Sequence, residues 1–374
     1  MVEKYQLGLL EDKGIIQLGR GKVISKKDIR DNPGDFPVYS SSSQNNGEVG
    51  TYGKYMFDDE RITWSIDGGG ILFYRNNHKY SVTNVCGWLK VLKEDTINCR
   101  YLYFTLFEQW QNKIFDYNHK AHPSIVRKEY VIPIPSLSEQ ERIVGILDTF
   151  TTSIENLKEQ IAQRRKQFEF YRDQLLDLEG KPGVEMKTLG EIGTFIRGTG
   201  IQKSDFVERG YPCIHYGQIH TKYGLSSDKT ISFISESLYK KSKKAVKGDV
   251  ILATTSEDAE GVAKPVAWLG NDEVAVSGDA FIYHHSQNAK FIAHLFSSHR
   301  FFLFKKMNAS GAKVVRISGD KMANFEFPLP TLSEQQRIVS YLDTFEESIS
   351  NLEAQLELRQ KQYEHYRNKL LTFD

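Results

Sequence analysis

Few residue patterns in this sequence could support catalysis. The tetrapeptide DNPG at Asp31–Gly34 is the nearest match to the N/D/S-P-P-Y/F loop with which a DNA adenine methyltransferase grips its base. It lacks the second proline and the aromatic residue, and it is typical of a turn. The DGGG of Asp67–Gly70 predicts a turn between strands, and the chain has no GxxxxGKS/T phosphate loop. Glu11, Asp12 and Lys13 form a lone match to a nuclease pattern. We therefore expect binding rather than bond cleavage.

Histidines and cysteines do not suggest a metal site or a disulfide framework. His284-His285 and the pair His215 and His220 lack accompanying Cys or Asp residues at ligand spacing. The cysteines form no CxxC pair and indicate a reducing cytoplasm: Cys86, Cys99 and Cys213. No apolar run reaches transmembrane length, and the N-terminus has no signal-peptide core. We expect a cytoplasmic protein with no metal site, no cofactor of its own and no membrane contact.

One long segment of the chain occurs twice. When Pro133–Leu176 is shifted by 195 positions onto Pro328–Leu371, 26 of 44 positions are identical. A period of this length indicates a duplicated domain with its connector, not a solenoid of short repeats. The sequence therefore predicts a pseudo-two-fold internal repeat in which two similar connectors alternate with two bodies that differ.

The two connectors are predicted to be long helices. Each contains a serine followed three residues later by Glu or Gln, the pattern of a capping box: Ser138 with Glu141, and Ser333 with Gln336. Pro135 and Pro330 lie just upstream, where a helix has not yet begun. The EGKPG of Glu179–Gly183 predicts the end of the first helix. Each helix is expected to be about 40 residues, or roughly 60 Å, long.

Apolar residues in both connectors recur at alternating steps of four and three, the 3.5-residue period of a coiled coil. The predicted seam residues are Ile143, Leu147, Phe150, Ile154, Leu157 and Ile161 in the first copy and Ile338, Leu342, Phe345, Ile349, Leu352 and Leu356 in the second. Arg164 and Arg359 occupy the next, skipped position. We expect the two helices to pair antiparallel, with one body at each end of the pair. The alternative is that each helix lies on its own globular domain.

Composition and charge divide the chain into four segments. Residues 1–132 carry a net charge of +2, residues 133–185 carry −3, residues 186–327 carry +5 and residues 328–374 carry −3. The two bodies are therefore positive and the two connectors negative, which favours a polyanion partner for the bodies. We call residues 1–132 the first module and residues 186–327 the second module.

Both modules have strand-like composition. Segments such as RITWSIDGGGILFYR and EVAVSGDAFIYHH are rich in β-branched and aromatic residues, and short helical stretches follow them. Traces of similarity link the modules, since Arg20-Gly21 and Arg197-Gly198 begin related stretches. We expect an α/β (α+β) fold with two β-rich globular domains and two long antiparallel coiled-coil helices.

These residues resemble a known family. The P-x-P-x-L-S-E-Q entry to a long helix, present twice, is similar to the conserved regions of type I restriction-modification DNA specificity subunits. The FPVYSSSSQNNGEVGTY and VKGDVILATTSEDAEGVAKPVAW segments look like parts of that family's target-recognition domains. The resemblance covers essentially the whole chain. It implies a non-catalytic subunit in which each module reads one half of a split site in double-stranded DNA and the helices set the gap.

The resemblance also implies partners. The chain would hold two methyltransferase subunits and, in a larger complex, two restriction and translocase subunits. S-adenosylmethionine, and ATP with Mg²⁺, would then belong to those partner subunits and not to this chain.

Side chains that hydrogen-bond to base edges or hold phosphates are the candidate DNA contacts. Those of the first module are Lys22, Lys26, Ser42, Gln44, Asn45, Asn46, Arg75, Asn77, Lys79, His119 and Lys120. Those of the second module are Arg197, Lys203, His215, Tyr216, Gln218, Lys222, Lys241, Lys244, Thr255, Ser256, Lys313 and Arg316. For any one of them, an ordinary solvated surface residue is the competing interpretation.

A rival hypothesis from another class is a coiled-coil scaffold that binds proteins through two β-rich modules. The positive modules and negative connectors favour DNA over this alternative. Variable loops follow no general recognition code, so the sequence does not predict the target bases or the spacer length. It also does not predict whether the system cuts DNA or only methylates it.

Overall fold

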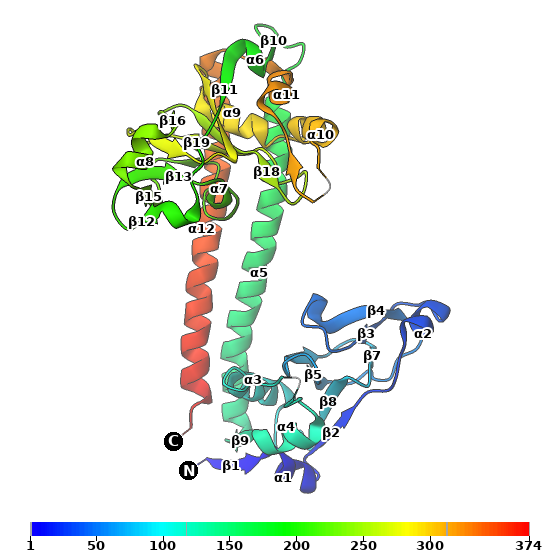
Figure 1. Cartoon of the computed structure of the whole chain (residues 1–374). Helices are drawn as coiled ribbons and strands as arrows, with labels where there is room; N and C mark the ends of the chain where they lie inside the picture. Colours follow the sequence, from blue (N-terminus) through cyan, green and yellow to red (C-terminus); the bar gives the residue numbers. More distant parts are fainter. Residues whose placement is uncertain (1, 117, 312, 374) are drawn as a thin grey trace. The chain divides into compact units, whose positions relative to one another are not determined.

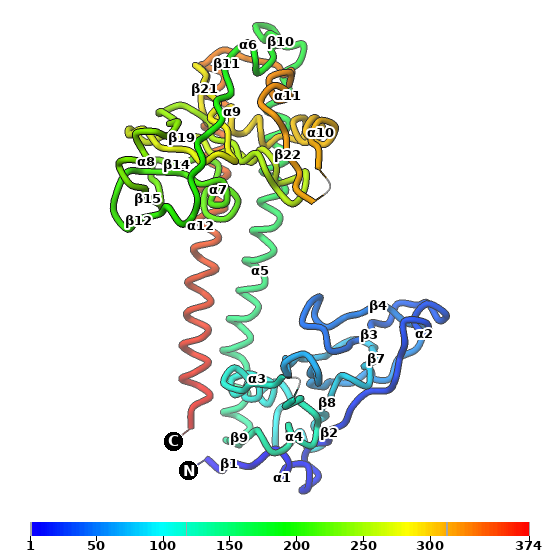
Figure 2. Tube along the Cα trace, in the orientation of Figure 1, coloured from blue at the N-terminus to red at the C-terminus, as the bar shows by residue number. Residues whose placement is uncertain are grey.

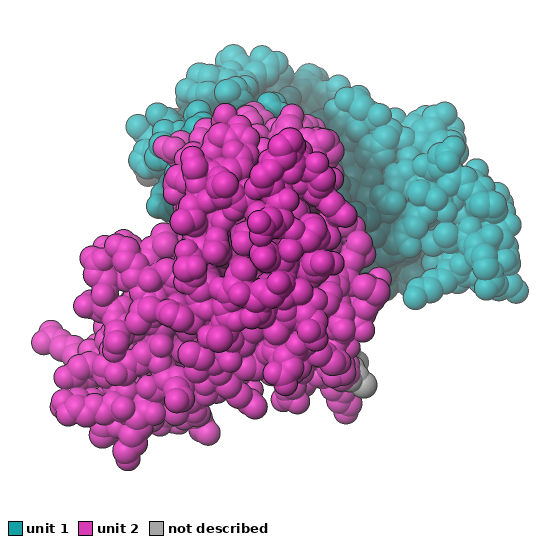
Figure 3. Space-filling model, turned by 90° about the horizontal axis from the view of Figure 1, so that it is seen from above, with its two compact units in different colours: residues 1–158, 354–374 teal, residues 159–353 magenta. Residues whose placement is uncertain are grey.

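The computed structural model describes residues 2–116, 118–311 and 313–373. Figures 1 and 2 trace the chain from the N-terminus in blue to the C-terminus in red. The chain divides into two compact units, which Figure 3 shows in different colours. Unit 1 comprises residues 1–158 and 354–374, and unit 2 comprises residues 159–353. Each unit therefore contains one module and a part of both long helices.

Unit 1 contains a four-stranded sheet in the order β2-β8-β5-β6 and a three-stranded sheet in the order β4-β3-β7. The elements of the first module are β1 (Glu3–Gln6), α1 (Leu7–Asp12), β2 (Ile16–Arg20), α2 (Lys26–Asp31), β3 (Phe36–Tyr39), the 3-10 turn η1 (Asn45–Gly47), β4 (Glu48–Tyr52), β5 (Arg61–Ser65), β6 (Leu72–Arg75), β7 (Ser81–Val82), β8 (Cys86–Val91), α3 (Cys99–Trp110), α4 (Pro123–Glu129) and β9 (Val131–Ile134). Trp64, Tyr101 and Phe104 lie in its core together with Ile143 and Leu147 of the long helix α5.

Unit 2 contains two five-stranded sheets in the orders β11-β21-β17-β19-β14 and β12-β15-β13-β20-β16. Its elements up to residue 253 are, in chain order, β10 (Glu185–Thr188), α6 (Leu189–Ile192), β11 (Gly193–Arg197), η2 (Lys203–Asp205), β12 (Phe206–Val207), β13 (Tyr211–Ile214), α7 (Tyr216–Thr221), β14 (Ser226–Ser227), β15 (Ser232–Ile234), α8 (Glu236–Lys241), β16 (Lys244–Ala245) and β17 (Val250–Ala253). The remainder are β18 (Thr255–Ser256), β19 (Lys264–Trp268), β20 (Val274–Val276), β21 (Ala280–His285), α9 (Ala289–Phe296), α10 (His299–Asn308), β22 (Val315–Arg316), α11 (Gly319–Ala323) and β23 (Glu326–Leu329).

The two modules share the core of one topology, to which the second module adds strands, and this confirms the predicted internal repeat. The order β2-β8-β5-β6 corresponds to β11-β21-β17-β19, and the parallel pair β3·β7 corresponds to β13·β20. The antiparallel pair β1·β9 likewise corresponds to β10·β23. The fold is the expected mixture of helix and sheet, with two β-rich domains and two long helices.

Two equivalent glycines explain the sequence trace that the modules share. Gly21 and Gly198 precede isolated parallel bridges from Lys22 to Thr83 and from Thr199 to Ser277. A Cβ atom would lie 2.0 Å from the carbonyl oxygen of Val82 at Gly21 and 2.2 Å from that of Ser277 at Gly198. Only glycine permits this close approach of two main chains.

Both long helices have 40 residues, α5 from Leu137 to Leu176 and α12 from Leu332 to Leu371. The predicted capping serines are wrong by two residues. The amide of Glu139 donates to Ser136 Oγ at 3.4 Å, and the amide of Glu334 donates to Thr331 Oγ1 at 3.4 Å, so Ser138 and Ser333 lie inside the first turn. The same S/T-x-x-E pattern starts two residues earlier in each copy, and it is the one that the helix uses.

The two helices pair antiparallel within each unit. In unit 2, the ring centroids of Tyr171 and Phe345 are 5.4 Å apart, and Arg165 Nη2 lies 2.5 Å from Glu353 Oε1. In unit 1, the rings of Phe150 and Tyr366 are 5.3 Å apart. The seam residues that are buried are Ile143, Leu147, Ile154, Ile161, Ile338 and Leu342. Partly buried seam residues are Phe150, Leu157, Arg164, Phe345, Ile349, Leu352, Leu356 and Arg359.

A buried glutamine joins each long helix to its module. Gln140 is 0% exposed, and its Oε1 accepts from the amide of Asn98, which is the N-cap of α3, at 2.8 Å. In the repeat, Gln335 is also 0% exposed and accepts from the amide of Asn288, the N-cap of α9, at 3.0 Å. The glutamine of the repeated LSEQ motif therefore fixes the start of a long helix to the start of a module helix.

Candidate nucleic-acid interface

The loop between β3 and β4 presents three exposed amide side chains in the first module. Gln44, Asn45 and Asn46 are exposed, whereas Gly47 is buried. The loop has a defined backbone, since the amide of Gly47 donates to the carbonyl of Gln44 at 2.9 Å. Ser42 Oγ accepts from the amide of Gln44 at 3.1 Å. These amide groups can each donate and accept, as readout of adenine in a DNA groove requires.

The segment of residues 75–79 begins at the end of strand β6 and continues into a loop. Arg75 is the last residue of β6 and is 1% exposed, so its guanidinium lies inside the module and not on a solvated turn. Asn77 is exposed with a φ of 59°, and Lys79 is exposed with Nζ 4.6 Å from the Tyr55 ring. Because polar residues follow β6 directly, the local sequence does not show at which residue the strand ends.

The segment that contains the candidates His119 and Lys120 contacts the glycine-rich turn of the same module. His119 stacks on Phe115 at 5.5 Å, and Lys120 Nζ lies 2.8 Å from Asp67 Oδ1. Asp67–Gly70 forms the predicted turn between β5 and β6. The two remaining candidates, Lys22 and Lys26, are exposed at the entry to α2.

The segment of residues 215–222 in the second module folds as the short helix α7 with its caps. His215 is its N-cap and is 6% exposed, and Nδ1 accepts from the amide of Gly217 at 3.1 Å. Burial lowers the pKa of His215, and the charge of Lys203 lowers it further. Gln218 completes a capping box and donates to Ser232 Oγ at 2.5 Å. Tyr216 is half-buried, while Lys222 is exposed beyond the last turn.

Lysines of the second module lie on several short elements. Lys203 is exposed in η2, and Lys241 is exposed at the end of α8. Lys244 is partly buried, with Nζ 3.3 Å from Glu273 Oε2 and 4.7 Å from the Tyr239 ring.

A basic cleft of about 240 Å³ lies in the second module. It is lined by Arg197, Thr254, Asp279, Phe281, Ser310, Arg316, Ile317, Ser318 and Lys321. Three of these side chains are cationic and one is a carboxylate, and three carry hydroxyl groups. Of the predicted residues, Arg197 and Arg316 line this cleft. Thr255 and Ser256 lie on the neighbouring strand, because Thr255 pairs with Arg316 and Ser256 pairs with Val315 in β18·β22. Lys313 is exposed in the loop that precedes β22.

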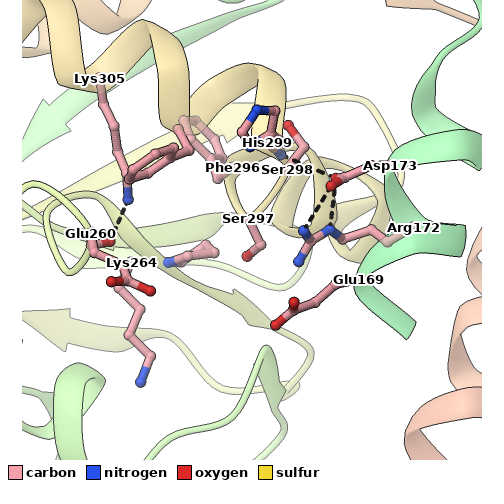
Figure 4. Close-up of a pocket in the computed structure, with 12 residues that line it drawn as sticks. Glu169, Arg172, Asp173, Glu260, Lys264, Phe296, Ser297, Ser298, His299 and Lys305 are labelled. Atoms are coloured by element: carbon pink, nitrogen blue, oxygen red, sulfur yellow. Dashed lines mark hydrogen bonds and ion pairs between the residues drawn. The ribbon is translucent and has the colours of Figure 1, made fainter. Parts of the chain in front are cut away.

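A second cavity of unit 2, of about 420 Å³, lies where α5 meets α10 (Figure 4). Asp173 of α5 accepts from the amide of His299 at 3.1 Å. Lys305 is 6% exposed and donates to the main-chain carbonyls of Glu260 and Val262, so it fixes the loop after β18. Burial lowers the pKa of Lys305 to about 8. The sequence did not single out Lys305, because only the structure shows that this lysine is buried.

An aromatic groove of about 540 Å³ lies on the helix pair in unit 2. Tyr171, Leu175, Tyr341 and Phe345 line it, and Tyr341 is 51% exposed. Exposed aromatic groups of this kind are common in protein interfaces. Among the described residues, no three His, Cys, Asp or Glu side chains gather as a metal site, and no helix is long and apolar enough to cross a bilayer.

A family model and two curated relatives identify the same family for this chain. Residues 10–164 and 182–359 match the family model described as the type I restriction modification DNA specificity domain. A putative type I specificity subunit from Mycoplasma pneumoniae is 29% identical over 378 residues, covering 98% of this chain and 98% of the relative. The specificity subunit of a type I restriction enzyme from Escherichia coli is 35% identical over 266 residues, covering 66% of this chain and 64% of the relative.

The fold has a solved counterpart as well. The crystal structure of a type I restriction-modification S subunit from M. genitalium covers 100% of this chain and 96% of its own, with a TM-score of 0.61 and 16% identity. A chain from a structure concerned with the assembly of a type I R-M system covers 95% of this chain and 96% of its own, with a TM-score of 0.56. At this identity the likeness concerns the fold alone.

Proposed function

The chain belongs to the type I restriction-modification DNA specificity family, and from this premise we propose how its modules and helices divide the recognition of DNA. It is a sequence-specific DNA-binding specificity subunit and not an enzyme. We place its action in the cytoplasm. The scaffold alternative has no comparable support.

Each module reads one half of a bipartite site. The observation that carries this proposal is the pairing of one shared sheet topology with two different sets of loops, one in each match to the family model. The domains are residues 1–132 and 186–327 for the two readers, and residues 133–185 and 328–374 for the helices that set the spacer.

Within the first module, the exposed amides of Gln44, Asn45 and Asn46 read base edges. Lysines around these amides bind the phosphates of the DNA backbone, and those contacts do not distinguish one base sequence from another. In the second module, the cleft at Arg197, Arg316 and Lys321 takes a backbone phosphate, because its cations outnumber its carboxylate by three to one. Exposed Lys241 adds a further phosphate contact.

The partners are double-stranded DNA, two methyltransferase subunits and, in the restriction complex, two restriction and translocase subunits. The aromatic groove at Tyr171, Tyr341 and Phe345 is one docking surface for a methyltransferase. S-adenosylmethionine, and ATP with Mg²⁺, bind those partner subunits.

The test is selection of binding sites from a randomised DNA library by the full chain assembled with its methyltransferase subunits. We expect one bipartite sequence with two specified halves and a constant unspecified gap. Binding that falls with salt but shows no sequence preference, or a single continuous site, would contradict the division of labour.

A further inference from the structure

The buried Arg75 of the first module has no carboxylate partner among the residues that the structure describes. Its side chain is 1% exposed, and no ion pair of its guanidinium is found within the described ranges 2–116, 118–311 and 313–373. Nε donates to Thr63 Oγ1 at 3.1 Å, and Nη2 donates to the carbonyl oxygen of Asn46 at 2.7 Å. Burying a charge is costly unless its hydrogen bonds are satisfied. The bonds to Thr63 and Asn46 therefore stabilise the buried guanidinium and tie it to the loop that contains Asn46.

Aromatic rings hold the guanidinium in place. Its central carbon lies 3.5 Å from the Tyr39 ring centroid and 4.7 Å from that of Phe73. The Tyr39 hydroxyl is itself hydrogen-bonded to His78 Nε2 at 3.0 Å. The planar group is therefore fixed in orientation, and only its edge meets the loop.

The loop that it meets is strained. Asn45, Asn46 and Gly47 have φ values of 46°, 54° and 81°, so two non-glycine residues in succession adopt the left-handed conformation. Such residues persist where the surrounding structure determines them. The guanidinium of Arg75 donates to the main-chain carbonyl of Asn46, the middle residue of this run. The side chain of Asn46 is exposed, and the next residue, Gly47, is buried.

We propose that Arg75 is a positioning residue that holds the main chain of residues 44–47 so that the amides of Gln44, Asn45 and Asn46 meet base edges in one geometry. This rests on the proposed function, in which this loop reads the first half-site. Arg75 itself does not touch DNA; it determines specificity through the loop.

Arg61 supplies a matched control. It lies opposite Arg75 in the β5·β6 register, is 8% exposed and stacks on Phe57 at 3.7 Å. Its guanidinium, however, pairs with Asp59 at 2.6 Å and has no hydrogen bond to the loop. Arg61→Met therefore removes a buried, stacked arginine from the same sheet without releasing residues 44–47.

The experiment uses the full chain assembled with its methyltransferase subunits. In Arg75→Met we expect discrimination between bases at the first half-site to fall by about tenfold or more. A change of this size corresponds to the loss of one bidentate contact to a base. The second half-site should be unchanged. Hydrogen exchange of the Gly47 amide should accelerate in Arg75→Met and not in Arg61→Met. Arg75→Lys, which keeps one donor, should fall between wild type and Arg75→Met.

Gln44→Ala with Asn45→Ala separates this inference from the function on which it rests. If that double variant relaxes the first half-site while a folded Arg75→Met keeps full discrimination, Arg75 does not position the loop. If the double variant leaves the first half-site intact, the loop is not a reader, and its assignment falls together with the role of Arg75. An equal loss in Arg61→Met would also overturn the inference, since it would show general destabilisation.

Discussion

Gly21 and Gly198 occupy the same place in the two modules, next to a main-chain bridge. A side chain at either position would clash with a carbonyl oxygen, because the added Cβ would lie only 2.0 or 2.2 Å from it. The neighbouring strands cannot separate without breaking their bridge. These residues limit which sequences can occupy the fold, independently of what the modules bind.

We predict that Gly21→Ala and Gly198→Ala each destabilise the chain by about 2 kcal/mol or more, as expected for overpacking. Gly145→Ala is the control, because an added Cβ in this part of α5 meets nothing within 4 Å. That substitution should stabilise the helix by up to about 1 kcal/mol. Urea denaturation of the three variants gives the comparison, and a neutral Gly21→Ala would refute the close approach.

His294 of α9 is the residue that most directly links pH to stability. It is 0% exposed, and among the described residues neither ring nitrogen has a hydrogen-bond partner. Burial lowers its pKa to about 3, with smaller contributions from Arg172 and Lys290. Counting from the N-caps Asn98 and Asn288, the equivalent residue in the first module is Phe104, which is also 0% exposed.

The unfolded chain binds a proton at His294 below pH 6.5 while the folded chain does not, so this residue makes stability fall as pH drops from 6.5 toward 3. The slope is about 1.4 kcal/mol per pH unit. We predict that His294→Phe flattens this slope and raises stability by about 1–3 kcal/mol, since unpaired buried polar atoms are removed. Phe104→His should introduce the same slope in the first module. Denaturation between pH 7 and 4 measures both, and an unchanged slope in His294→Phe would exclude His294 as its source.

At the scale of elements, the joint between long helix and module is a hydrogen-bonded one. Gln140 accepts from Asn98 and donates to the carbonyl of Pro135 at 2.9 Å, and Gln335 makes the same bond to Pro330 at 2.9 Å. Arg100 with Asp148 and Lys290 with Asp343 repeat an ion pair beside each joint. The start of α3 therefore fixes α5, and the start of α9 fixes α12.

We predict that Gln140→Leu destabilises the first module by about 1–3 kcal/mol, because the amide of Asn98 loses its acceptor. Hydrogen exchange should rise in α3 and remain unchanged in α9. Gln335→Leu should give the reciprocal pattern, and exposed Gln160→Leu should affect neither. Equal effects of Gln140→Leu on α3 and α9 would mean that the joints are not independent.

The sequence predicts these elements unevenly, for physical reasons. Heptad spacing is a local pattern, so the two long helices could be predicted from the sequence. The structure confirms them and their antiparallel pairing. Their first residues were missed because two S/T-x-x-E/Q patterns overlap in each copy, and the local sequence does not select between them. Sheet order was not predicted, because pairs such as β3·β7 join residues about 43 positions apart, as Val38 and Ser81 are. For the same reason the sequence did not show that Arg75 is buried at the end of a strand.

For the whole molecule, unlike modules on a repeated scaffold imply independent readout. We predict that exchange of residues 186–327 for the second module of another family member changes one half of the recognised sequence and leaves the other half intact. The replacement must keep Asn288 as N-cap and its bond to Gln335. Site selection with the chimaera is the measurement, and a change in both halves would contradict independent reading.

The length of the helix pair should set the gap between half-sites. Insertion of seven residues after both Gln160 and Gln355 keeps the heptad phase and adds about 10 Å of rise. Because DNA advances about 3.4 Å per base pair, the spacer should lengthen by about three base pairs. The added twist of the DNA is expected to lower affinity. Insertion into one helix alone should mismatch the pair and destabilise it. An unchanged spacer with good affinity in the double insertion would show that the helices are not the ruler.

The two aromatic stacks on the helices are one contact made twice. Adding the repeat offset of 195 to Phe150 and Tyr171 gives Phe345 and Tyr366, so Phe150–Tyr366 and Tyr171–Phe345 are the same pair with its partners exchanged. An ancestor of half this length could make both stacks by meeting a second copy of itself as a symmetric dimer. Fusion of two such copies into one chain would allow each helix to diverge. Arg165 now faces Glu353, whose counterpart in the first helix is Lys158, so two half-length copies of the present first helix would set like charges together. The charges of the fused chain therefore disfavour pairing of its first helix with the first helix of another copy.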